Sequence, residues 1–482
     1  MKQADVITVV DLGTTNIVAM VGKRNSFGAI QILAYETEPS EQCIKRGYVY
    51  NIEKTGGIVK RLILKLRNKT GYKIEQVYVG VGGQSLRSMN YTVSKILGED
   101  AIVTEGILND LERETREYQP ELVDVLDIVS PEYNLDGQTL LDPLGLACNR
   151  IEANYKIIIG RPTLRKGIVN SILNHAKINI EGIIVSPLAL ADVVLTDEEK
   201  ELGSAVINFG GGVTTLAVYK RGVLQGLSVI PFGSNLITRD LMSLHVSEKE
   251  AERLKNAFGK AMPEVEKETK VSITLDNGSI SEKKLIDINY IVEARSREII
   301  KNVYRQVEEL DLQDELKAGV VISGGGSALK RLSEAVSDTF KTSVRSASLK
   351  NDIDLEGVIA FSNPLYSTAI ALLVEAIGMD AREQSPIVEP SFTETEPANI
   401  VVETKEEDVK QDTPITVTKQ PKAENIEKDP PTPRPKPSTE SILTRIGKKI
   451  ISVTDGASNT LFRDDDFREE KDDDSKRENN ND

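Results

Sequence analysis

One short pattern occurs twice in this chain, in residues 6–21 and again in residues 204–219. Each copy consists of an apolar strand, a polar residue near its end, a turn with glycine and threonine, and a second apolar strand: "VITVVDLGTTNIVAMV" and "SAVINFGGGVTTLAVY". Because a strand follows each turn, the pattern predicts a β-hairpin and is neither a Walker loop nor a dinucleotide fingerprint. The backbone N–H groups of such a tight turn can bind an anion. Two of these hairpins on facing domains could hold a polyphosphate between them.

The polar residue differs between the two copies. It is Asp11 in the first copy and Asn208 in the second. A carboxylate inside an apolar strand is costly to desolvate unless something pairs with it. Asp11 therefore requires a partner.

Two further groups of residues suit a nucleotide. The glycines 324–326 follow a strand-like run and precede a helical pattern at residues 328–340, and glycines let a flat purine ring approach the backbone closely. Upstream, "EAERLK" places Glu252 and Lys255 on one face of a helix, where polar groups can hold a ribose. A single glycine turn is usually just a turn, but three clusters in this order, two of them duplicates, indicate a nucleotide site.

Length, charge and composition exclude several classes. The chain has 482 residues and a net charge of −15, so we expect more than one domain and no nucleic-acid partner, because nucleic-acid-binding proteins usually present a basic face. Two cysteines, Cys43 and Cys148, and two histidines lack metal-like spacing, which argues against a zinc site or a disulfide framework and suits a reducing cytoplasm. Acids interrupt the apolar N-terminus, which therefore does not resemble a signal peptide, and no apolar run is long enough to span a bilayer.

The chain changes character near its C-terminus. Between residues 6 and 377, β-branched strands alternate with amphipathic helical patterns, which indicates an α/β architecture. Residues 379–438 contain ten of the nineteen prolines among acids, lysines and threonines, so we expect a disordered linker. Residues 439–454 are typical of an amphipathic helix, and we expect residues 455–482 to form an acidic disordered tail.

These features together resemble the actin superfamily, with "DLGTTN" and "NFGGGVTT" as its two phosphate loops and "SGGGSAL" as its adenosine loop. Within it, the chain resembles the FtsA family of bacterial cell-division proteins. The stretch "CIKRGYVYNIEKTGGIVKRLI" looks like the segment before that family's first helix, "VYVGVGG" like its entry to an inserted subdomain, and "NPLYSTAIALL" like its closing helix. The proline-rich linker and the terminal amphipathic helix are similar too.

The resemblance implies an α/β, actin-like fold of two lobes, each a ribonuclease H-like domain, around a nucleotide cleft. An inserted 1C subdomain replaces the usual 1B, and the linker and the amphipathic helix follow. The boundaries that we expect are 1A at residues 1–83, 1C at 84–162, the second part of 1A at 163–203, 2A at 204–235, 2B at 236–313, and the second part of 2A with the closing helix of 1A at 314–378.

The resemblance also implies a site for ATP and Mg²⁺. Asp11 would lie near the magnesium ion and its waters. The phosphates would be held from one side by Gly13, Thr14, Thr15 and Asn16, and from the other by Asn208, Gly210, Gly211, Gly212 and Thr214, with Gly233 beside them. Glu252 and Lys255 would hold the ribose, and Gly324, Gly325 and Gly326 the adenine.

Two positions depart from the superfamily pattern. The second phosphate loop usually begins with Asp, whereas Asn208 supplies an amide here, and magnesium prefers charged oxygens. Ser186 stands where relatives with clear ATPase activity carry Glu-Pro or Gln, and a serine is a poor group for orienting the attacking water. We therefore expect ATP binding with at most very slow hydrolysis, and we assign no catalytic residue.

The amphipathic segment predicts a membrane contact. An apolar face with a basic flank on a flexible tether is typical of a helix that lies in an anionic membrane surface; a helix that packs on the globular body or on a partner is the alternative. The residues that we expect at the membrane are Ile442, Leu443, Arg445, Ile446, Lys448, Lys449 and Ile450.

FtsA relatives polymerise, receive the short, mixed apolar and acidic C-terminal tail of FtsZ on 2B, and tether FtsZ filaments to the cytoplasmic face of the inner membrane at the division septum. Other divisome proteins bind through 1C. The resemblance implies the same roles here, with Arg295 and Lys301 facing the FtsZ tail. A PilM-like pilus-assembly adaptor, which shares a similar insertion, and an actin-fold phosphotransferase stay open as alternatives, although we find no convincing acidic base for the latter. A DnaK-type chaperone would need a β-sandwich domain where the chain has its polar C-terminal region.

Overall fold

Both copies of the repeated pattern form antiparallel hairpins, as the sequence predicts. The structure is a computed structural model that describes residues 6–384 except 264–267, 352, 358–360 and 362. The two hairpins consist of β1 (Ile7–Leu12) with β2 (Asn16–Arg24), and of β12 (Ser204–Phe209) with β13 (Thr214–Lys220).

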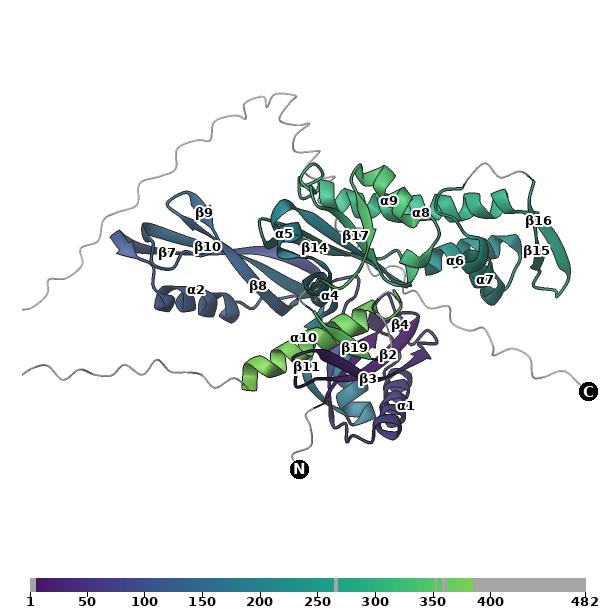
Figure 1. Cartoon of the computed structure of the whole chain (residues 1–482), viewed down its shortest axis with the longest axis horizontal. Coiled ribbons are helices and arrows are strands. Elements are labelled where there is room, and N and C mark those ends of the chain that lie inside the picture. The colour runs from purple at the N-terminus through teal and green to yellow at the C-terminus, as the bar shows by residue number, and fades with distance from the viewer. Residues whose placement is uncertain (1–5, 264–267, 352, 358–360, 362, 385–482) are drawn as a thin grey trace, which may run out of the picture. The chain divides into compact units, whose positions relative to one another are not determined.

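Each hairpin is part of a sheet with the same plan (Figure 1). The strand order is β11-β6-β1-β2-β3-β19 in the first sheet, and the second sheet begins β18-β17-β12-β13-β14. In both sheets, two further strands lie beside the first strand of the hairpin and run parallel to it. The strand beside the second strand of the hairpin is antiparallel to that strand. We call the parts built on these sheets the first and second lobes. The further strands are β3 (Ile30–Pro39), β6 (Gln76–Val81), β11 (Asn179–Val185), β14 (Val223–Ile230), β17 (Gly319–Ser323), β18 (Val344–Ser346) and β19 (Leu355–Gly357).

Helix α1 (Ile52–Thr70) covers the first sheet, and its sequence sets both of its ends. The Asn51 side chain accepts a hydrogen bond from Lys54 N at the start, and Gly71 adopts a left-handed conformation (φ 75°) at the end. Residues three and four apart, Ile58, Leu62 and Leu66 among them, are buried against the sheet. The other elements of the first lobe are β4 (Ile44–Lys45), β5 (Tyr48–Val49), α3 (Pro162–Val169) and the π-helix η1 (Asn170–Ala176).

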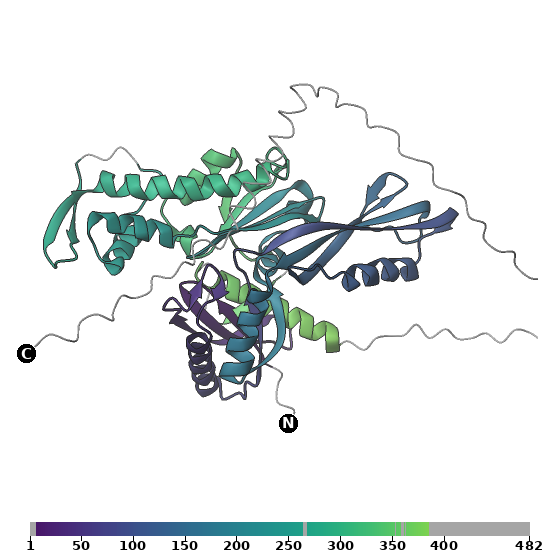
Figure 2. The ribbon, with the colours of Figure 1, turned by 180° about the vertical axis from the view of Figure 1, so that it is seen from behind.

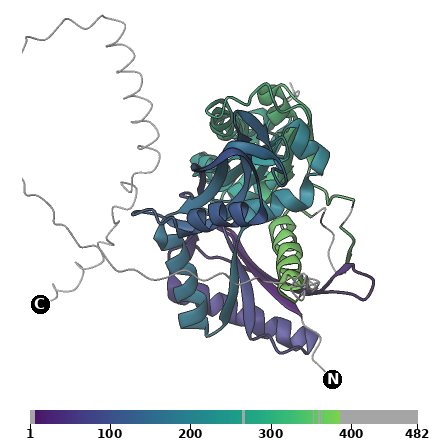
Figure 3. The same cartoon turned by 90° about the vertical axis from the view of Figure 1, so that its left-hand side faces the viewer.

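Two helices pack against each other and connect the two lobes. Helix α4 (Ser186–Val194) contacts β13 of the second sheet, and α10 (Ser367–Gln384) lies on β1 and β2 of the first, where Figure 3 shows it in light green. Helix α10 continues six residues past position 378, after which we expected the linker, because Met379 still packs on the core of the first lobe. The link between the lobes also contains α5 (Asp197–Leu202).

An inserted unit lies between β6 and α3, at residues 82–161 (Figure 2). A polar helix packs on long antiparallel strands over a small core that includes Val93, Leu111 and Ile151. The order of this sheet continues from β14 of the second lobe through β7-β10-β8-β9. Its elements are β7 (Arg87–Ile102), α2 (Glu105–Glu117), β8 (Asp124–Leu135), β9 (Gln138–Leu140) and β10 (Ala147–Gly160).

The second lobe carries extra elements between β14 and its long helix. They are α6 (Asn235–Leu241), the 3-10 helix η2 (Met242–Leu244), α7 (Glu248–Phe258), β15 (Lys270–Thr274) and β16 (Ile280–Lys284), followed by α8 (Leu285–Glu308). The predicted helix at residues 328–340 begins later, as α9 (Leu332–Phe340), after the 3-10 helix η3 (Gly325–Ala328). Arg331 at φ 60° interrupts the right-handed backbone between them.

Most of the predicted C-terminal features fall beyond residue 384. The predicted linker beyond residue 384, the helix at 439–454 with its seven membrane residues, and the tail at 455–482 lie outside the described residues. Within the described part of the chain, no helix has the length and apolar character needed to cross a membrane.

Candidate functional site

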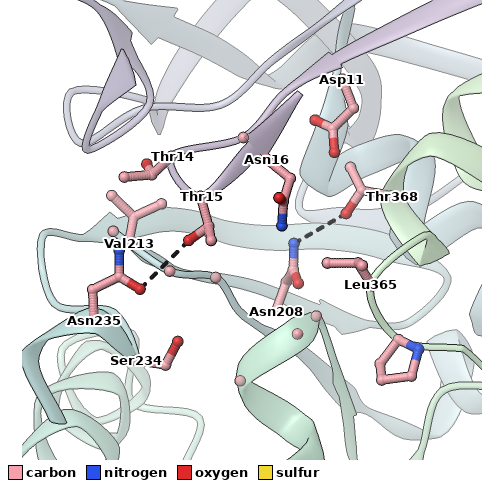
Figure 4. A pocket seen from close by; sticks show the side chains of 18 of the residues that line it. Asp11, Thr14, Thr15, Asn16, Asn208, Val213, Ser234, Asn235, Leu365 and Thr368 are labelled. Atoms are coloured by element: carbon pink, nitrogen blue, oxygen red, sulfur yellow. Dashed lines mark hydrogen bonds between the residues drawn. The ribbon is translucent and has the colours of Figure 1, made fainter. Parts of the chain in front are cut away.

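The loops of the two hairpins line one pocket of about 510 Å³ (Figure 4), a size within the usual range for small-molecule sites. Fourteen of the sixteen nucleotide-binding residues predicted from the sequence line it: Asp11, Gly13, Thr14, Thr15, Asn16, Asn208, Gly210, Gly211, Gly212, Glu252, Lys255, Gly324, Gly325 and Gly326. Residues from four separate segments of the chain therefore meet at one cavity.

The two loops have equivalent backbones. A Cβ atom on Gly13 would lie 2.5 Å from the carbonyl oxygen of Asn16, and one on Gly210 would lie 2.7 Å from that of Val213. No real side chain fits at such distances, so both turns require glycine at their first position.

The loops also approach each other closely. A Cβ on Gly212 would lie 2.6 Å from Thr14 Oγ1, and one on Gly211 would lie 2.0 Å from Thr15 Oγ1. Thr15 Oγ1 donates a hydrogen bond across the pocket to Asn235 Oδ1 at 3.4 Å. The glycines of the second loop thus leave room for the threonine hydroxyls of the first.

Backbone hydrogen bonds hold the second loop in place. The N–H groups of Ser234 and Asn235 donate to the carbonyls of Gly210 and Gly211, both at 2.9 Å. In the first loop, Ser40 Oγ donates to the carbonyl of Gly13 at 2.6 Å. Each loop is therefore fixed by its own lobe before any ligand binds.

Asp11 lies deep in the pocket, and within the described part of the chain its carboxylate has no hydrogen-bond or ion-pair partner. Burial raises its pKa to about 6. Figure 4 shows the carboxylate directed toward the space that Asn208 and Thr368 border. A cation, or the waters around one, would supply the missing partner and fits this carboxylate.

Asn208 carries the second unsatisfied group. Its amide nitrogen donates to Thr368 Oγ1 at 3.4 Å, whereas its Oδ1 is buried and lacks a hydrogen-bond partner. Ser323, its neighbour on β17, also has a buried hydroxyl without a partner. Buried polar atoms are rarely left unsatisfied, so Asn208, which lines the pocket, carries an acceptor that still needs a partner.

Glu252 and Lys255 form one hydrogen-bonded group on α7. Lys255 Nζ lies 2.7 Å from Glu252 Oε2 and 3.0 Å from Thr238 Oγ1, and only 7% of Lys255 is exposed. Burial opposes ionisation of Glu252, but hydrogen bonds from Lys255 and Thr238 and the charge of Lys255 together lower its pKa. The carboxylate thus stays charged and can accept hydrogen bonds from a polar ligand.

The third glycine cluster lies close to the second loop. Gly324 has φ 82°, and a Cβ there would lie 2.1 Å from Asn208 Oδ1. Leu365, from the segment before α10, lines the same part of the pocket, near Gly325. Glycine backbone and an apolar side chain thus line the same part of the pocket, a surface that suits a flat ring.

Two predicted residues do not line the pocket. Thr214 is fully buried and donates to the Phe232 carbonyl at 2.8 Å, while Thr215 lines the pocket, since neighbouring strand residues point to opposite faces. Gly233 supports the loop from behind, where a Cβ would lie 2.3 Å from the Gly211 carbonyl oxygen.

Some lining residues were not predicted. Asn235 lies two residues after Gly233 in the stretch "PFGSNL", so the glycine predicted there already pointed to this segment. Thr368 is the second residue of α10, in a stretch whose sequence indicated only a closing helix. Other lining residues that the sequence did not point to include Gly47, Gly80, Gly82, Ser234 and Asn363.

Of the residues on α8 that we expect to face a partner, Arg295 is already paired with acidic side chains of this chain. Arg295 is bound to Asp240 on α6, with Nε–Oδ2 at 2.6 Å and Nη2–Oδ1 at 3.1 Å, and it also pairs with Glu298. Lys301 and Arg305 are exposed on α8. An acidic ligand would reach these two side chains directly, whereas Arg295 is already neutralised by two carboxylates.

Comparisons with known proteins agree with this arrangement. The family model "Cell division protein FtsA" matches residues 205–371, and "SHS2 domain inserted in FTSA" matches residues 83–159. The chain is 30% identical over 395 residues to the cell division protein FtsA of Neisseria meningitidis, covering 80% of this chain and 93% of that protein. It is 29% identical over 407 residues to FtsA of Porphyromonas gingivalis, covering 83% of each. Among solved structures, a chain of the PilM-PilN type IV pilus biogenesis complex is similar with a TM-score of 0.55 and 14% identity, covering 77% of this chain and 98% of that one.

Proposed function

The chain belongs to the FtsA family of cell-division proteins, and on this basis we propose that it binds ATP with Mg²⁺ in the pocket, polymerises, and tethers FtsZ to the inner face of the cytoplasmic membrane. Its fold is the actin-like one that the resemblance implied, with the SHS2 unit inserted in the first lobe. The cell-division role is inferred from the family, and the binding of ATP is inferred from the residues that line the pocket.

One observation carries the nucleotide proposal. Two hairpin turns from the two lobes face the same pocket, and Asp11 presents a partly buried, unpaired carboxylate to it. Rows of backbone N–H groups bind phosphate oxygens, and the carboxylate needs a positive partner. A triphosphate with a divalent cation satisfies both requirements at once.

Asp11 would hold the magnesium ion through its coordinated waters. The described residues contain no group of three or more acids, histidines or cysteines that could bind a metal alone, which suits Mg²⁺, since this ion usually takes one or two carboxylates together with the phosphates of its ligand. When bound, the ion neutralises phosphate charge. Thr14 and Thr15 would orient the phosphates, and the pair of Glu252 and Lys255 would bind the ribose hydroxyls.

We propose that hydrolysis is very slow. Asp11 and Glu252 are the carboxylates among the pocket's described lining residues, and Glu252 is already bound to Lys255 and Thr238. Ser186 lines the pocket at the start of α4 but is a poor base. For the same reason a phosphotransferase, which would need a base near the γ-phosphate, is not proposed. The nucleotide would mainly stabilise the closed form of the two lobes by binding it preferentially.

Filament formation and membrane attachment would reinforce each other. The sequence of residues 439–454 has an apolar face and a basic flank. Each basic residue near anionic lipid contributes about 1 kcal/mol, so one copy would bind weakly. A filament that presents many copies would bind well through effective concentration. The 2B elements would receive the FtsZ tail, and the inserted unit would bind other divisome proteins.

Electron microscopy of the purified protein on lipid monolayers tests this proposal. We expect filaments on anionic monolayers with ATP and Mg²⁺, and none in bulk solution. Neutral monolayers and an Ile446→Asp, Ile450→Asp variant serve as controls, and both should lack filaments. Absence of filaments on anionic lipid under all nucleotide conditions would refute the polymerisation and membrane parts of the proposal.

A further inference from the structure

The inserted unit belongs to the first lobe by chain connection but is hydrogen-bonded to the second. The chain enters it from β6 and leaves it to α3, both in the first lobe. Yet Arg87 on β7 pairs with Ser228 on β14, and Ser88 Oγ accepts a hydrogen bond from Leu227 N at 2.9 Å. Figure 2 shows β7 beside the strands of the second sheet. The second sheet and the sheet of the inserted unit are therefore continuous.

A second contact lies at the tip of the β13–β14 hairpin. Arg221 (φ 54°) and Gly222 (φ 75°) form its tight turn. Arg221 Nη2 lies 2.9 Å from Glu132 Oε1 on β8, and the Glu132 side chain is only 16% exposed. A Cβ on Gly222 would lie 3.4 Å from the Leu141 side chain of the inserted unit. The hairpin is thus fixed to the inserted unit at two places.

The same hairpin begins at the pocket. Residues 210–213, which line the pocket, lead directly into β13, and Thr214 at its first position is bound to the Phe232 carbonyl just after β14. The seven residues of β13 span about 23 Å. One end of a continuous antiparallel ladder therefore lines the pocket, and the other end contacts the inserted unit.

The buried side chain of Tyr219 on β13 adds a further connection between the hairpin and the inserted unit. Tyr219 on β13 is only 5% exposed, and burial and the charges of Asp192 and Asp127 raise its pKa. Asp192 belongs to α4, and Asp127 to β8 of the inserted unit. Lys200 binds Asp192 at 2.7 Å and lies 5.2 Å from the centre of the Tyr219 ring. The second sheet, the inserted unit and the link between the lobes meet at this point.

We propose that the β13–β14 hairpin couples the pocket to the inserted unit, so that the inserted unit follows the second lobe when a ligand closes the pocket. The coupling path stands on the contacts above, and only the identity of the ligand rests on the proposed function. Because coupling between two sites is reciprocal, a partner bound to the inserted unit changes the affinity of the pocket for its ligand by the same factor.

Hydrogen exchange of the nucleotide-free protein tests the path. We call the contacts of Ser88 with Leu227 and of Arg221 with Glu132 the joint. The joint variant removes both contacts by Ser88→Ala and Arg221→Gln. The control is Arg113→Gln, which removes an exposed ion pair with Asp110 inside the inserted unit. The reporters are the amides of Ser234 and Asn235, which are bonded to the pocket loop. We expect their exchange to rise roughly three- to tenfold in the joint variant and to stay constant in the control.

Two results would overturn the coupling. Faster exchange at Leu227 with unchanged exchange at Ser234 and Asn235 would mean that the joint opens without affecting the pocket. Unchanged exchange at Leu227 would mean that the joint does not form. Neither result depends on nucleotide.

Adding ATP with Mg²⁺ separates the two proposals. We expect slower exchange at Leu227 and Ser228 in the wild-type protein and no such protection in the joint variant, whereas protection in both would contradict the coupling. Calorimetry on the same samples reports ATP binding itself. Absence of binding heat would refute the proposed nucleotide site, and the nucleotide-free exchange data would still decide whether the pocket and the inserted unit are coupled.

Discussion

Asp11 and Asn208 occupy the same position in two equivalent hairpins. Each is the last residue but one of its first strand, Asp11 opposite Val18 and Asn208 opposite Thr215, and each loop has four residues between its last paired positions. Both side chains line one pocket. Two copies of one structural unit thus present an acid from one lobe and an amide from the other, which gives the site a single formal charge at this pair.

Replacing Asp11 with Asn should weaken the binding of magnesium–ATP at least about tenfold and also stabilise the ligand-free protein. Burial raises the pKa of Asp11 from 3.8 to about 6, so ionisation opposes folding. This cost is absent at pH values below 3.8, grows as the pH rises and is complete above 6. At pH 7.5 the variant should gain about 1–3 kcal/mol in the free energy of unfolding.

Urea denaturation and calorimetry check this prediction, with exposed Asp314→Asn as the matched control. A variant that loses stability without ligand would show that Asp11 has a partner in the folded protein.

The affinity for magnesium–ATP should depend on pH through the same carboxylate. A cation favours the ionised form, so the dissociation constant should fall about tenfold between pH 5 and pH 7.5, as Asp11 loses its proton near pH 6. ATP itself titrates in this range, and the Asp11→Asn variant reports that contribution alone. Parallel pH profiles for the wild-type protein and the variant would contradict the prediction.

The sequence predicted the paired hairpins well because strand periodicity and a glycine turn are local features. It could not decide which of two neighbouring threonines points into the pocket, since Thr214 and Thr215 differ only in register. It also could not show that Asp240 binds Arg295, because 55 residues separate the two and only the packing of α6 on α8 brings them together. The lining residues that were missed, such as Thr368, likewise come from segments whose position depends on tertiary contacts.

Gly212→Ala should block close approach of the two loops. The new methyl group would lie 2.6 Å from Thr14 Oγ1 and 2.7 Å from Thr14 Cγ2, so one loop must move away. We expect at least about a tenfold loss of ATP affinity with a change of less than about 1 kcal/mol in unfolding free energy, because the site faces the pocket and not the core. Gly57→Ala on α1, where the nearest atom is 3.8 Å away, is the control and should keep wild-type affinity. Unchanged affinity in Gly212→Ala would show that the loops need not approach each other.

Asp240→Asn should strengthen the binding of an acidic peptide from the FtsZ tail about threefold, because it releases part of the charge of Arg295. Arg295→Glu should weaken that binding, and neither change should alter ATP affinity. Fluorescence anisotropy of a labelled peptide measures the effect. Asp276→Asn, in the turn between β15 and β16, removes the same charge elsewhere on these elements and should have little effect. Equal gains from Asp240→Asn and Asp276→Asn would mean that general charge, and not Arg295, attracts the peptide.

Asn208→Asp tests the asymmetry between the two hairpins. A second carboxylate would face the same pocket as Asp11, so the like charges should lower stability without metal, and Mg²⁺ should restore it by binding both acids. The melting temperature should therefore become dependent on magnesium, which it should not be in the wild-type protein without nucleotide. Phosphate release in single-turnover experiments should nevertheless stay very slow, because Ser186 still cannot orient a water. Adding Ser186→Gln should then increase the rate at least about tenfold. If Asn208→Asp alone releases phosphate at an ordinary enzymatic rate, the metal site and not Ser186 limits hydrolysis in this chain.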